Sequence, residues 1–495
     1  MTATHVDVLV VGAGLSGIGA GYRLQTQTPG KTYAILEARH AIGGTWDLFR
    51  YPGVRSDSDM FTLSYPFRPW TNPKSIADGP AIVSYIRSTA AKYDIERHIR
   101  FGHRVVRASW STQDARWTVE ASHDGSTVTF TCSFLYLCSG YYSYTGGHVV
   151  EFPGQSEFTG PVVHPQHWPA DLDYAGKRVV IIGSGATAVT LVPAMADAGA
   201  AHVTMLQRSP SYVVARPTAD PMADRLRSLL PGHLAHRAIR GRNVVMSTLF
   251  YQMFRRLPER SATMLMAGVE KAVEGAIAVD PHFKPKYNPW DQRMCLVPDG
   301  DLFRVIRERK ADVVTDRISR FTASGVELAS GRTLPADVIV TATGLRMVAF
   351  GDIEMTVDGE VVKPHDTTVY KGMMFSGIPN LAWCVGYVNN SWTLRADLTT
   401  QYVCRLINHM ARHGYDFCVP AVSESDADDG RPLLDLTSGY IQRAAALLPH
   451  QGTRQPWRHR QNYLVDLATM RLRRVNDGAM RFGRSGVRAG DRTAA

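Results

Sequence analysis

The stretch that decides the fold is VDVLVVGAGLSG, which runs from Val6 to Gly17. Its first half, residues 6–11, is apolar and rich in β-branched side chains, which predicts a buried parallel strand. The glycine turn from Gly12 to Gly17 follows, and a helix is expected after it. A second strand, at 32–36, ends at Glu37, 20 residues after the last glycine of the turn. Together these segments predict one βαβ unit with a complete dinucleotide-binding fingerprint.

Each glycine of this first turn has its own predicted role in holding a dinucleotide. Gly12 permits a tight turn, and Gly14 lets the main chain approach a pyrophosphate at the positive end of the helix. Gly17 permits close packing of the helix on the strand. Glu37 is expected to accept hydrogen bonds from ribose hydroxyls.

The same pattern returns about 170 residues later in the chain. A strand is expected at 178–182, followed by the turn Gly183-Ser184-Gly185-Ala186-Thr187-Ala188 and a helix. The fingerprint tolerates Ala188 in place of the last glycine. The second strand of this unit, 202–206, leads into Gln207 and Arg208. Two such turns predict two nucleotide sites or one duplicated fold.

The residue that ends the second unit indicates which nicotinamide cofactor the unit binds. Arg208, followed by Ser209, stands where the first unit has an acid. A carboxylate would repel a ribose 2′-phosphate, whereas a guanidinium binds it with two hydrogen bonds. The second site is therefore predicted to prefer NADPH to NADH. Two nucleotide folds in one chain suggest a relay in which NADPH reduces a bound flavin, which then reduces an acceptor or activates oxygen.

The cysteines narrow these two outcomes. None of the six forms a C-x-x-C pair, so the metal-ligand spacing and the redox pair typical of disulfide reductases are both absent from the sequence. Six scattered cysteines in a long chain are typical of a reducing cytoplasm, which is the predicted compartment. No metal site is expected. The cysteines are Cys132, Cys138, Cys295, Cys384, Cys404 and Cys418.

Composition and charge set wider limits. The 495 residues allow two or three domains, and 44% hydrophobic with 20% charged residues is typical of a globular protein. The net charge of +10 could attract phosphate-rich cofactors, nucleic acid or anionic lipid, but an ordinary basic surface is favoured and no nucleic-acid partner is predicted.

No basic segment precedes the first apolar run, so no signal peptide is expected. The charge-free stretch 179–196 is predicted as strand, turn and helix rather than a membrane span.

Arginines are dense between residues 216 and 285, where they alternate with Leu, Met and Phe. This pattern predicts a helical insertion. A helical cap with one solvated face is favoured, and peripheral contact with a membrane or a partner is the alternative. Localisation is accordingly predicted as cytoplasmic, with membrane association through this insertion as the alternative. The arginines are Arg225, Arg227, Arg237, Arg240, Arg242, Arg255, Arg256 and Arg260.

The segment that joins the two units carries a family resemblance. Residues 158–169, FTGPVVHPQHWP, resemble the F-x-G-x-x-x-H-x-x-x-W-P fingerprint of Baeyer–Villiger monooxygenases and lie just before the second turn, as in that family. A second pattern also matches: Gly43-Gly44-Thr45-Trp46, four residues, Tyr51-Pro52-Gly53, three residues and Asp57. Flavin monooxygenases that oxidise heteroatoms usually have Tyr or Phe in place of Trp168. The similarity extends along nearly the whole chain and is closest to the ethionamide-activating subgroup of actinobacteria.

This resemblance implies a definite reaction. NADPH reduces FAD, and the reduced flavin adds O2 to form a C4a-peroxyflavin. The peroxide attacks the carbonyl of a small ketone, and the adduct rearranges to an ester or lactone while NADP+ stays bound. Sulfides and thioamides are further expected substrates.

The resemblance also assigns the catalytic residues. Arg293, in Asn288-Pro289-Trp290-Asp291-Gln292-Arg293, matches the family's catalytic arginine, and Asp57 matches the carboxylate that orients it. An anionic peroxide and an anionic adduct need a fixed cation nearby, and a guanidinium keeps its charge throughout. His164 is expected to be packed and hydrogen-bonded in a linker rather than to act as a base. Many relatives have Lys where Gln292 stands, which leaves more of the NADPH selectivity to Arg208.

The remaining cofactor contacts are carried over by position. Those expected at the flavin are Ser16, Thr45, Trp46, Asp47, Leu48 and Val105. Those expected at the nicotinamide cofactor are Arg55, Ser56, Ser184, Gly185, Ala186, Thr187, Ala188, Val189 and Thr190.

The predicted architecture is therefore α/β, with two Rossmann-like dinucleotide-binding domains and a helical insertion. Residues 1–140 and 346–495 are predicted to bind FAD, residues 141–215 and 286–345 to bind NADPH, and residues 216–285 to form the insertion. The tail from Arg484 is expected to fray. Three alternatives stay open: an N- or S-oxidising flavin monooxygenase, a flavoprotein reductase that never activates oxygen, and a nucleotide-binding sensor without chemistry.

Overall fold

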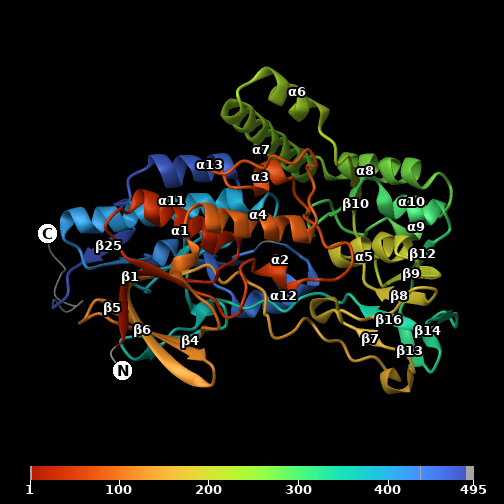
Figure 1. Cartoon of the computed structure of the whole chain (residues 1–495), viewed down its shortest axis with the longest axis horizontal. Coiled ribbons are helices and arrows are strands. Elements are labelled where there is room, and N and C mark those ends of the chain that lie inside the picture. Colours follow the sequence, from red (N-terminus) through yellow and green to blue (C-terminus); the bar gives the residue numbers. More distant parts are fainter. Residues whose placement is uncertain (1–2, 435, 487–495) are drawn as a thin grey trace.

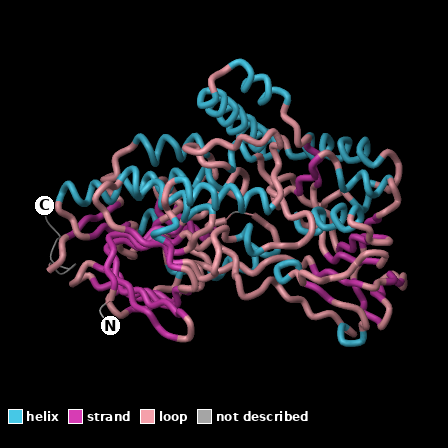
Figure 2. Tube along the Cα trace, in the orientation of Figure 1, coloured by secondary structure: helices cyan, strands magenta, loops and turns pink. Residues whose placement is uncertain are grey.

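The computed structural model describes residues 3–434 and 436–486. The chain is organised around two β-sheets that lie at opposite ends of the molecule, each with its own helices (Figure 1). Figure 2 shows the separation of the two groups of strands, with helices above both. The predicted α/β class is confirmed.

The first sheet contains both strands of the first glycine unit. Its order is β18-β17-β4-β5-β6-β1-β2-β3, with β21 paired to β6, and β1, β2, β3, β6 and β21 run parallel. The hairpin strands β4 and β5 pair antiparallel with each other, and β5 pairs antiparallel with β6, an extension that the sequence pattern did not predict. The strands are β1 (Thr4–Val11), β2 (Tyr33–Leu36), β3 (Ile99–Arg100), β4 (Arg104–Ser111), β5 (Arg116–His123), β6 (Ser126–Leu137), β17 (Glu354–Val357), β18 (Glu360–Val361) and β21 (Leu381–Trp383).

Both faces of β1 are buried, which explains its unbroken apolar sequence. Val8 and Val10 pack in the core beneath helices α1, α4 and α11, whereas Leu9 and Val11 pack in the core on the opposite face. Helix α11 lies beside α1 on the first sheet (Figure 1). The helices and short turns of this part are α1 (Leu15–Gln27), α2 (Thr45–Leu48), α3 (Met60–Leu63), α4 (Gly79–Lys92), η1 (Glu96–His98) and α11 (Trp392–His413).

The second sheet has the order β12-β9-β8-β16-β7, and all of these pairs are parallel. The strand predicted at 178–182 is confirmed. The predicted linker contributes an edge strand to this sheet, because Val162 and Val163 pair with β16. The elements are η2 (Gln155–Glu157), β7 (Val162–Val163), η3 (Pro165–His167), β8 (Arg178–Ile182), α5 (Ala186–Asp197), β9 (His202–Gln207), α10 (Asp301–Arg307), β12 (Ala311–Thr315) and β16 (Val338–Thr341), with a small sheet of β13 (Ile318–Thr322), β14 (Gly325–Leu328) and β15 (Thr333–Pro335).

The arginine-rich segment is helical, as predicted. It begins and ends at two strands that pair parallel, β10 (Val213–Arg216) and β11 (Cys295–Pro298), so its two ends lie side by side. Helices α6 and α7 project from the body of the molecule (Figure 1). Stretch 179–196 forms β8 and α5, and no helix in the described residues has the length and apolarity needed to span a bilayer. The insertion helices are α6 (Pro221–Leu229), α7 (Gly232–Arg256), α8 (Pro258–Val273) and α9 (Val279–His282).

The C-terminal part packs back on the first sheet. Here the expectation of a frayed tail is wrong at its start, because Arg484 Nε donates to the carbonyl of Gly414 at 2.9 Å and the Ser485 N–H donates to Asp416 at 2.8 Å. Residues 487–495 of that tail lie outside the described residues. The remaining elements are η4 (Pro364–Asp366), β19 (Val369–Tyr370), β20 (Met374–Phe375), β22 (Phe417–Pro420), η5 (Glu424–Asp426), β23 (Asp428–Pro432), α12 (Gly439–Ala444), η6 (Ala445–Leu447), β24 (His450–Gly452), α13 (Tyr463–Leu467), η7 (Ala468–Leu472) and β25 (Met480–Gly483).

Candidate functional site

A cavity of about 590 Å³ opens between the carboxyl ends of the two parallel sheets. This is the position at which open α/β sheets bind ligands, and the volume is within the range of cofactor pockets, about 300–1,000 Å³. Residues from both glycine turns line it. The predicted site residues on its walls are Gly12, Gly14, Ser16, Glu37, Thr45, Trp46, Arg55, Ser56, Asp57, Val105, Ala186, Thr187, Thr190 and Arg293.

The first glycine turn is built as its sequence predicted. Gly12 has φ +103°, and a Cβ there would lie 2.7 Å from the carbonyl oxygen of Cys138. Gly17 is buried away from the cavity, where a Cβ would lie 1.8 Å from the Gly12 carbonyl oxygen, so only glycine lets α1 pack this closely on β1. Gly14 faces Gly44 across the cavity wall, with 3.4 Å from an added Cβ to the Gly44 Cα. Two bare glycine surfaces at a helix start form a cradle that fits a pyrophosphate.

Polar groups at the end of β2 complete the dinucleotide fit. The Glu37 carboxylate accepts the main-chain N–H groups of Ala13 at 2.7 Å and Arg39 at 2.9 Å, and burial raises its pKa. Glu37 still lines the cavity, where each carboxylate oxygen has capacity for a further hydrogen bond. The Nε of Arg39, also on the wall, is buried with no hydrogen-bond partner among the described residues. These groups fit the ribose and phosphate of a dinucleotide.

The second glycine turn presents a more open surface. Gly183 has φ +146° and touches the Ala342 carbonyl, whereas an added Cβ on Gly185 would meet nothing within 4 Å. Beyond the end of β9, Arg208 and Ser209 are exposed, and the Arg208 side chain forms no ion pair with another described residue. Its guanidinium is therefore accessible to a phosphate. The predicted residues of this region that do not line the cavity are Gly183, Ser184, Gly185, Ala188, Val189, Arg208 and Ser209.

The two predicted catalytic residues form an ion pair on the cavity wall. Arg293 Nη2 lies 2.6 Å from Asp57 Oδ2, and their side chains are 30% and 37% exposed. The charge of Asp57 raises the pKa of Arg293, so the guanidinium stays charged at any working pH. Tyr141 and Tyr142 line the same wall and interact with the charge of Arg293. The arrangement offers a permanent cation, held by a carboxylate, to an anion in the cavity.

Two predicted flavin contacts lie elsewhere. The Asp47 carboxylate is buried and bonded to Arg39 at 2.6 Å and Arg87 at 3.1 Å, and neither Asp47 nor Leu48 lines the cavity. Asp47 therefore orients Arg39, which does line it. Arg55 is on the wall, but its guanidinium is paired with Asp301 at the start of α10.

The fingerprint segment lies outside the cavity. His164 Nδ1 accepts the N–H of Gln166 at 3.2 Å, and burial lowers the pKa of His164, so the ring is packed, hydrogen-bonded and neutral, as expected. Trp168 packs edge-on against Tyr174, with ring centroids 6.4 Å apart. The segment shapes the second sheet and contributes no group to the wall.

Several wall residues were missed by sequence reasoning. Trp392 is the clearest, since its indole N–H donates to Ser16 Oγ at 2.7 Å and joins α11 to the first turn. A glycine after the buried strand β6, Gly140, is the one sequence signal that could have drawn attention to the tyrosines that follow it. The missed wall residues with polar or aromatic side chains include Arg39, Tyr51, Tyr141, Tyr142, Tyr144, Tyr387, Asn390 and Trp392.

Two cysteines meet although their spacing gave no sign of it. Cys138 follows β6 and Cys384 follows β21, at the ends of paired parallel strands. The Cys138 thiol stabilises the thiolate of its neighbour and so lowers the pKa of Cys384. All six cysteines are buried and free, and the described residues include no group of three or more His, Cys, Asp or Glu side chains placed to hold a metal ion.

Known proteins share these features. A family profile described as Flavin-binding monooxygenase-like matches residues 56–231, and one described as NAD(P)-binding Rossmann-like domain matches residues 10–74. The chain is 53% identical to FAD-containing monooxygenase EthA of Mycobacterium tuberculosis over 480 residues, which cover 97% of this chain and 98% of that protein. It is 44% identical to probable FAD-binding monooxygenase AlmA of Acinetobacter baylyi, over 97% of this chain and 96% of that protein.

Solved structures share the fold. An oxidised steroid monooxygenase bound to NADP matches with a TM-score of 0.75 and 22% identity, over 97% of this chain and 100% of that one. An open crystal structure of cyclohexanone monooxygenase matches with a TM-score of 0.69 and 23% identity, over 85% and 90%. The two Rossmann-like domains predicted from the glycine turns are thus confirmed. Identity above one half along almost the entire length confirms the predicted family as well: the chain belongs to the FAD-containing monooxygenases of the EthA type.

Proposed function

We propose that the protein is an NADPH-dependent Baeyer–Villiger monooxygenase. It inserts one oxygen atom from O2 into small ketones to give esters or lactones, and it also oxidises sulfides or thioamides. The observation that carries this proposal is the Arg293–Asp57 ion pair of 2.6 Å on the wall of a cavity that both glycine turns line. FAD, when bound, supplies the activation of O2.

The chain's own residues supply the electrostatics of the reaction. Negative charge develops on the carbonyl oxygen of a ketone when an oxygen nucleophile adds to it, and Arg293 offers a fixed cation to that oxygen. Because Asp57 holds the guanidinium, no reorganisation is required as the charge develops. Arg293 can transfer no proton under working conditions, so its role is stabilisation rather than acid catalysis.

The proposed cofactor contacts divide between the two glycine units, and not all of them line the cavity. Gly12, Gly14, Ser16, Glu37 and the residues from Thr45 to Leu48, with Val105, are proposed to hold FAD. Arg55, Ser56 and residues 183–190 are proposed to hold NADPH. Arg208 and Ser209 are proposed to bind its 2′-phosphate, which is supported by their exposure beyond the end of β9.

The domain division follows the two sheets. Residues 1–140 and 346–495 are proposed as the FAD domain, and residues 141–215 and 286–345 as the NADPH domain. Residues 216–285 are proposed as the helical insertion that interrupts the NADPH domain. The support is that the strands of each sheet fall within these ranges.

The test is NADPH consumption by the purified holoenzyme across a panel of ketones and sulfides, with products identified by mass spectrometry. Ester or lactone formation, with one NADPH consumed per product, is expected. Sulfoxide without ester would instead identify a heteroatom-oxidising flavin monooxygenase. Release of hydrogen peroxide with no oxygenated product from any substrate would identify a reductase, and a colourless protein without FAD would identify a sensor.

We further propose that the insertion contacts membranes peripherally. Helices α6 and α7, which project in Figure 1, carry the exposed apolar residues Met222, Leu229, Val245, Leu249 and Phe250. The segment from Pro221 to Val273 has nine basic and three acidic residues. Apolar side chains flanked by arginines are complementary to an anionic bilayer surface. The exposed arginines here are Arg225, Arg237, Arg255, Arg256 and Arg260.

A further inference from the structure

One wall of the cavity comes from a segment far from both glycine turns. Residues 384–391 connect β21 to α11, and Tyr387, Asn390 and Trp392 at this junction line the cavity. Tyr387 is 2% exposed, so its position is set by what lies behind the wall. That surrounding structure combines the apolar side chains of Val244 and Leu394 with a polar, charged cluster.

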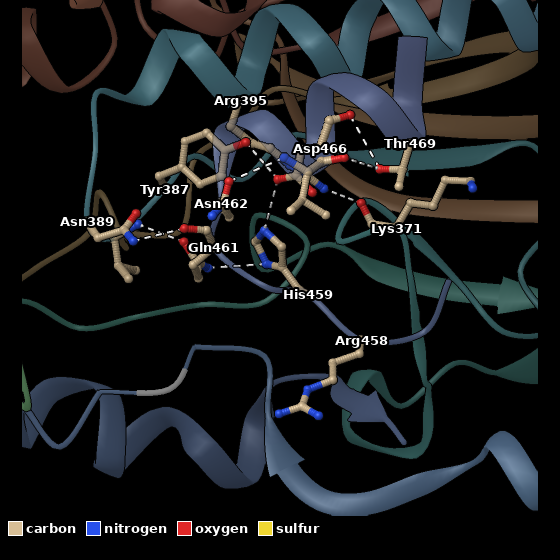
Figure 3. Close-up of polar contacts among 12 residues, drawn as sticks. Lys371, Tyr387, Asn389, Arg395, Arg458, His459, Gln461, Asn462, Asp466 and Thr469 are labelled. Carbon is tan, nitrogen blue, oxygen red and sulfur yellow. Dashed lines mark hydrogen bonds and ion pairs between the residues drawn. The ribbon is translucent and has the colours of Figure 1, made fainter. Parts of the chain in front are cut away.

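Behind the wall, Tyr387 is bonded to a buried ion pair (Figure 3). The Tyr387 hydroxyl donates to Asp466 Oδ2 at 2.6 Å, and Arg395 Nη1 lies 2.5 Å from the same oxygen. Arg395 is fully buried, and its other terminal nitrogen donates to the carbonyl of Lys371. One carboxylate oxygen thus receives both the phenol of the cavity wall and the guanidinium of α11.

The charges of this cluster balance. His459 lies beside Asp466, with 3.9 Å from its Nε2 to Oδ2, and burial lowers its pKa to about 3, so the ring is neutral. Arg395 and Asp466 are then the two charged residues of this cluster within the described part of the chain. A buried ion pair is costly to desolvate and is seldom the most stable filling of a core. The Arg395–Asp466 pair instead contributes geometric precision, because each partner fixes the direction of the groups that are hydrogen-bonded to it.

The rest of the segment is held from two sides. Gln461 accepts the Val388 N–H on its side-chain oxygen at 3.2 Å and the Asn389 side-chain N–H on its carbonyl at 2.9 Å (Figure 3). On the other side, Asn390 Nδ2 donates to Ser247 Oγ of α7 at 3.1 Å. The wall is therefore clamped between the C-terminal segment and the helical insertion.

We propose that Tyr387 sets the shape of the cavity wall against the organic substrate, and that Asp466 and Arg395 are positioning residues that act through it. Within this wall Trp392 bonds to the first glycine turn through Ser16, whereas Tyr387 packs against Val244 of α7 and Leu394 of α11. The effect of Tyr387 is therefore assigned to the substrate rather than to cofactor binding. This inference rests on the proposed function only because oxygenated product is one of the quantities that its test measures.

The chain contains a matched control. The Tyr370 hydroxyl donates to Asp477 Oδ2 at 2.8 Å, and Lys371 Nζ lies 2.7 Å from that oxygen, so Tyr370 also bonds to a carboxylate paired with a cation. Tyr370 is fully buried and does not line the cavity. Tyr387→Phe removes a hydrogen bond to a carboxylate at the wall. Tyr370→Phe removes the equivalent bond away from the wall, together with a hydrogen bond to the Tyr402 hydroxyl at 3.0 Å, so it is the more disruptive of the two for the core.

The experiment measures three quantities for both variants of the FAD-loaded enzyme. These are the FAD content, the KM for NADPH, and the KM for the organic substrate together with the fraction of NADPH that yields product rather than hydrogen peroxide. Tyr387→Phe is expected to keep the first two and to raise the substrate KM by about tenfold, the effect of one hydrogen bond to a charged group, with more peroxide released. Tyr370→Phe is expected to leave all three unchanged.

Equal effects of the two variants, or a lower melting temperature of Tyr387→Phe with an unchanged substrate KM and unchanged peroxide release, would overturn the proposal. Asp466→Asn tests the link behind the wall: it is expected to repeat the KM shift of Tyr387→Phe, and combining both changes is expected to add little. If Asp466→Asn does not fold, the Tyr387→Phe result alone decides. If no oxygenated product forms in the wild type, the proposed function fails, while substrate binding to the wall, measured by the change in flavin absorbance, still tests this inference.

Discussion

The guanidinium of Arg293 and the carboxylate of Asp57 meet at 2.6 Å, although the two residues lie far apart in the sequence. Asp57 follows the first βαβ unit, and Arg293 lies just before β11, where the helical insertion returns to the second sheet. Each side chain keeps about a third of its surface accessible. The pair therefore couples the two nucleotide-binding parts of the chain and still faces the cavity.

Arg293→Ala is expected to keep FAD and its reduction by NADPH but to lose ketone oxygenation. The reason is that the oxyanion on the substrate loses its fixed cation, an effect of about 10²–10³ in kcat for a single stabilising group. Stopped-flow reduction of the flavin and ester yield measure the two steps separately. Arg304→Ala is a matched control, since Arg304 also pairs with a carboxylate, Asp197, at 2.6 Å but lies off the cavity. Normal ester formation by Arg293→Ala would refute the assignment.

Arg208→Ala is expected to raise the KM for NADPH by about 10- to 100-fold and to leave the KM for NADH nearly unchanged. A guanidinium bonded to a phosphate contributes a few kcal/mol, and NADH lacks the 2′-phosphate. Steady-state kinetics with both nucleotides on the same preparation provide the internal control. An unchanged ratio of the two KM values would exclude Arg208 from the 2′-phosphate site.

Two equivalent glycines offer a test of which turn holds which cofactor. Gly14 and Gly185 both have negative φ, and an added Cβ would meet no protein atom closer than 3.4 Å at Gly14 and none within 4 Å at Gly185. Alanine is therefore compatible with the fold at both sites, but its methyl group would occupy the path of a phosphate. Gly14→Ala is expected to lose bound FAD, and Gly185→Ala to keep FAD but bind NADPH weakly. Flavin absorbance and NADPH titration report each outcome, and a loss of FAD from Gly185→Ala would contradict it.

The stability of the protein is expected to fall on acidification through His459. Its folded pKa of about 3 lies below the usual value of 6.5, so the unfolded chain binds a proton first. The contribution of neutral His459 is complete above about pH 6.5 and is lost as the pH falls toward 3, about 2 kcal/mol between pH 7 and pH 5. His236, with a pKa of about 4, acts in the same direction. Chemical unfolding at both pH values should therefore show a smaller loss in His459→Gln than in the wild type, and an equal loss would contradict it.

Membrane contact is expected to depend on the exposed apolar side chains of α7. Leu249→Glu combined with Phe250→Glu should abolish cosedimentation with vesicles that contain anionic phospholipid, because both side chains are about half exposed on the projecting helix. Wild-type binding should weaken at high salt. Val149→Glu, at a 72% exposed residue outside the insertion, is the control that should bind normally. Wild-type protein that does not bind anionic vesicles would end the proposal.

The local elements followed from the sequence because their signals are local. A run of β-branched residues, as in β1 and β8, predicts a parallel strand buried on both faces. The residue that ends each βαβ unit, Glu37 or Arg208, indicates which ribose group that unit binds. The fingerprint around His164 and Trp168 identified the family, although it contributes nothing to the cavity wall. The strand within it, Val162–Val163, could not be predicted from the sequence, because two residues are too few to show a strand periodicity.

What the tertiary structure decided was which distant residues share a wall. Trp392 bonds to Ser16, Arg395 and Asp466 hold Tyr387, and Cys138 meets Cys384, each across separations that no spacing rule describes. The physical reason is that motifs report local main-chain structure, which nearby residues determine, whereas a cavity wall is formed by side chains that only the tertiary packing brings together. The sequence by itself determined two dinucleotide folds and the kind of flavoprotein. Only the packing of α11, the C-terminal segment and the insertion against them decided the wall that an organic substrate would meet.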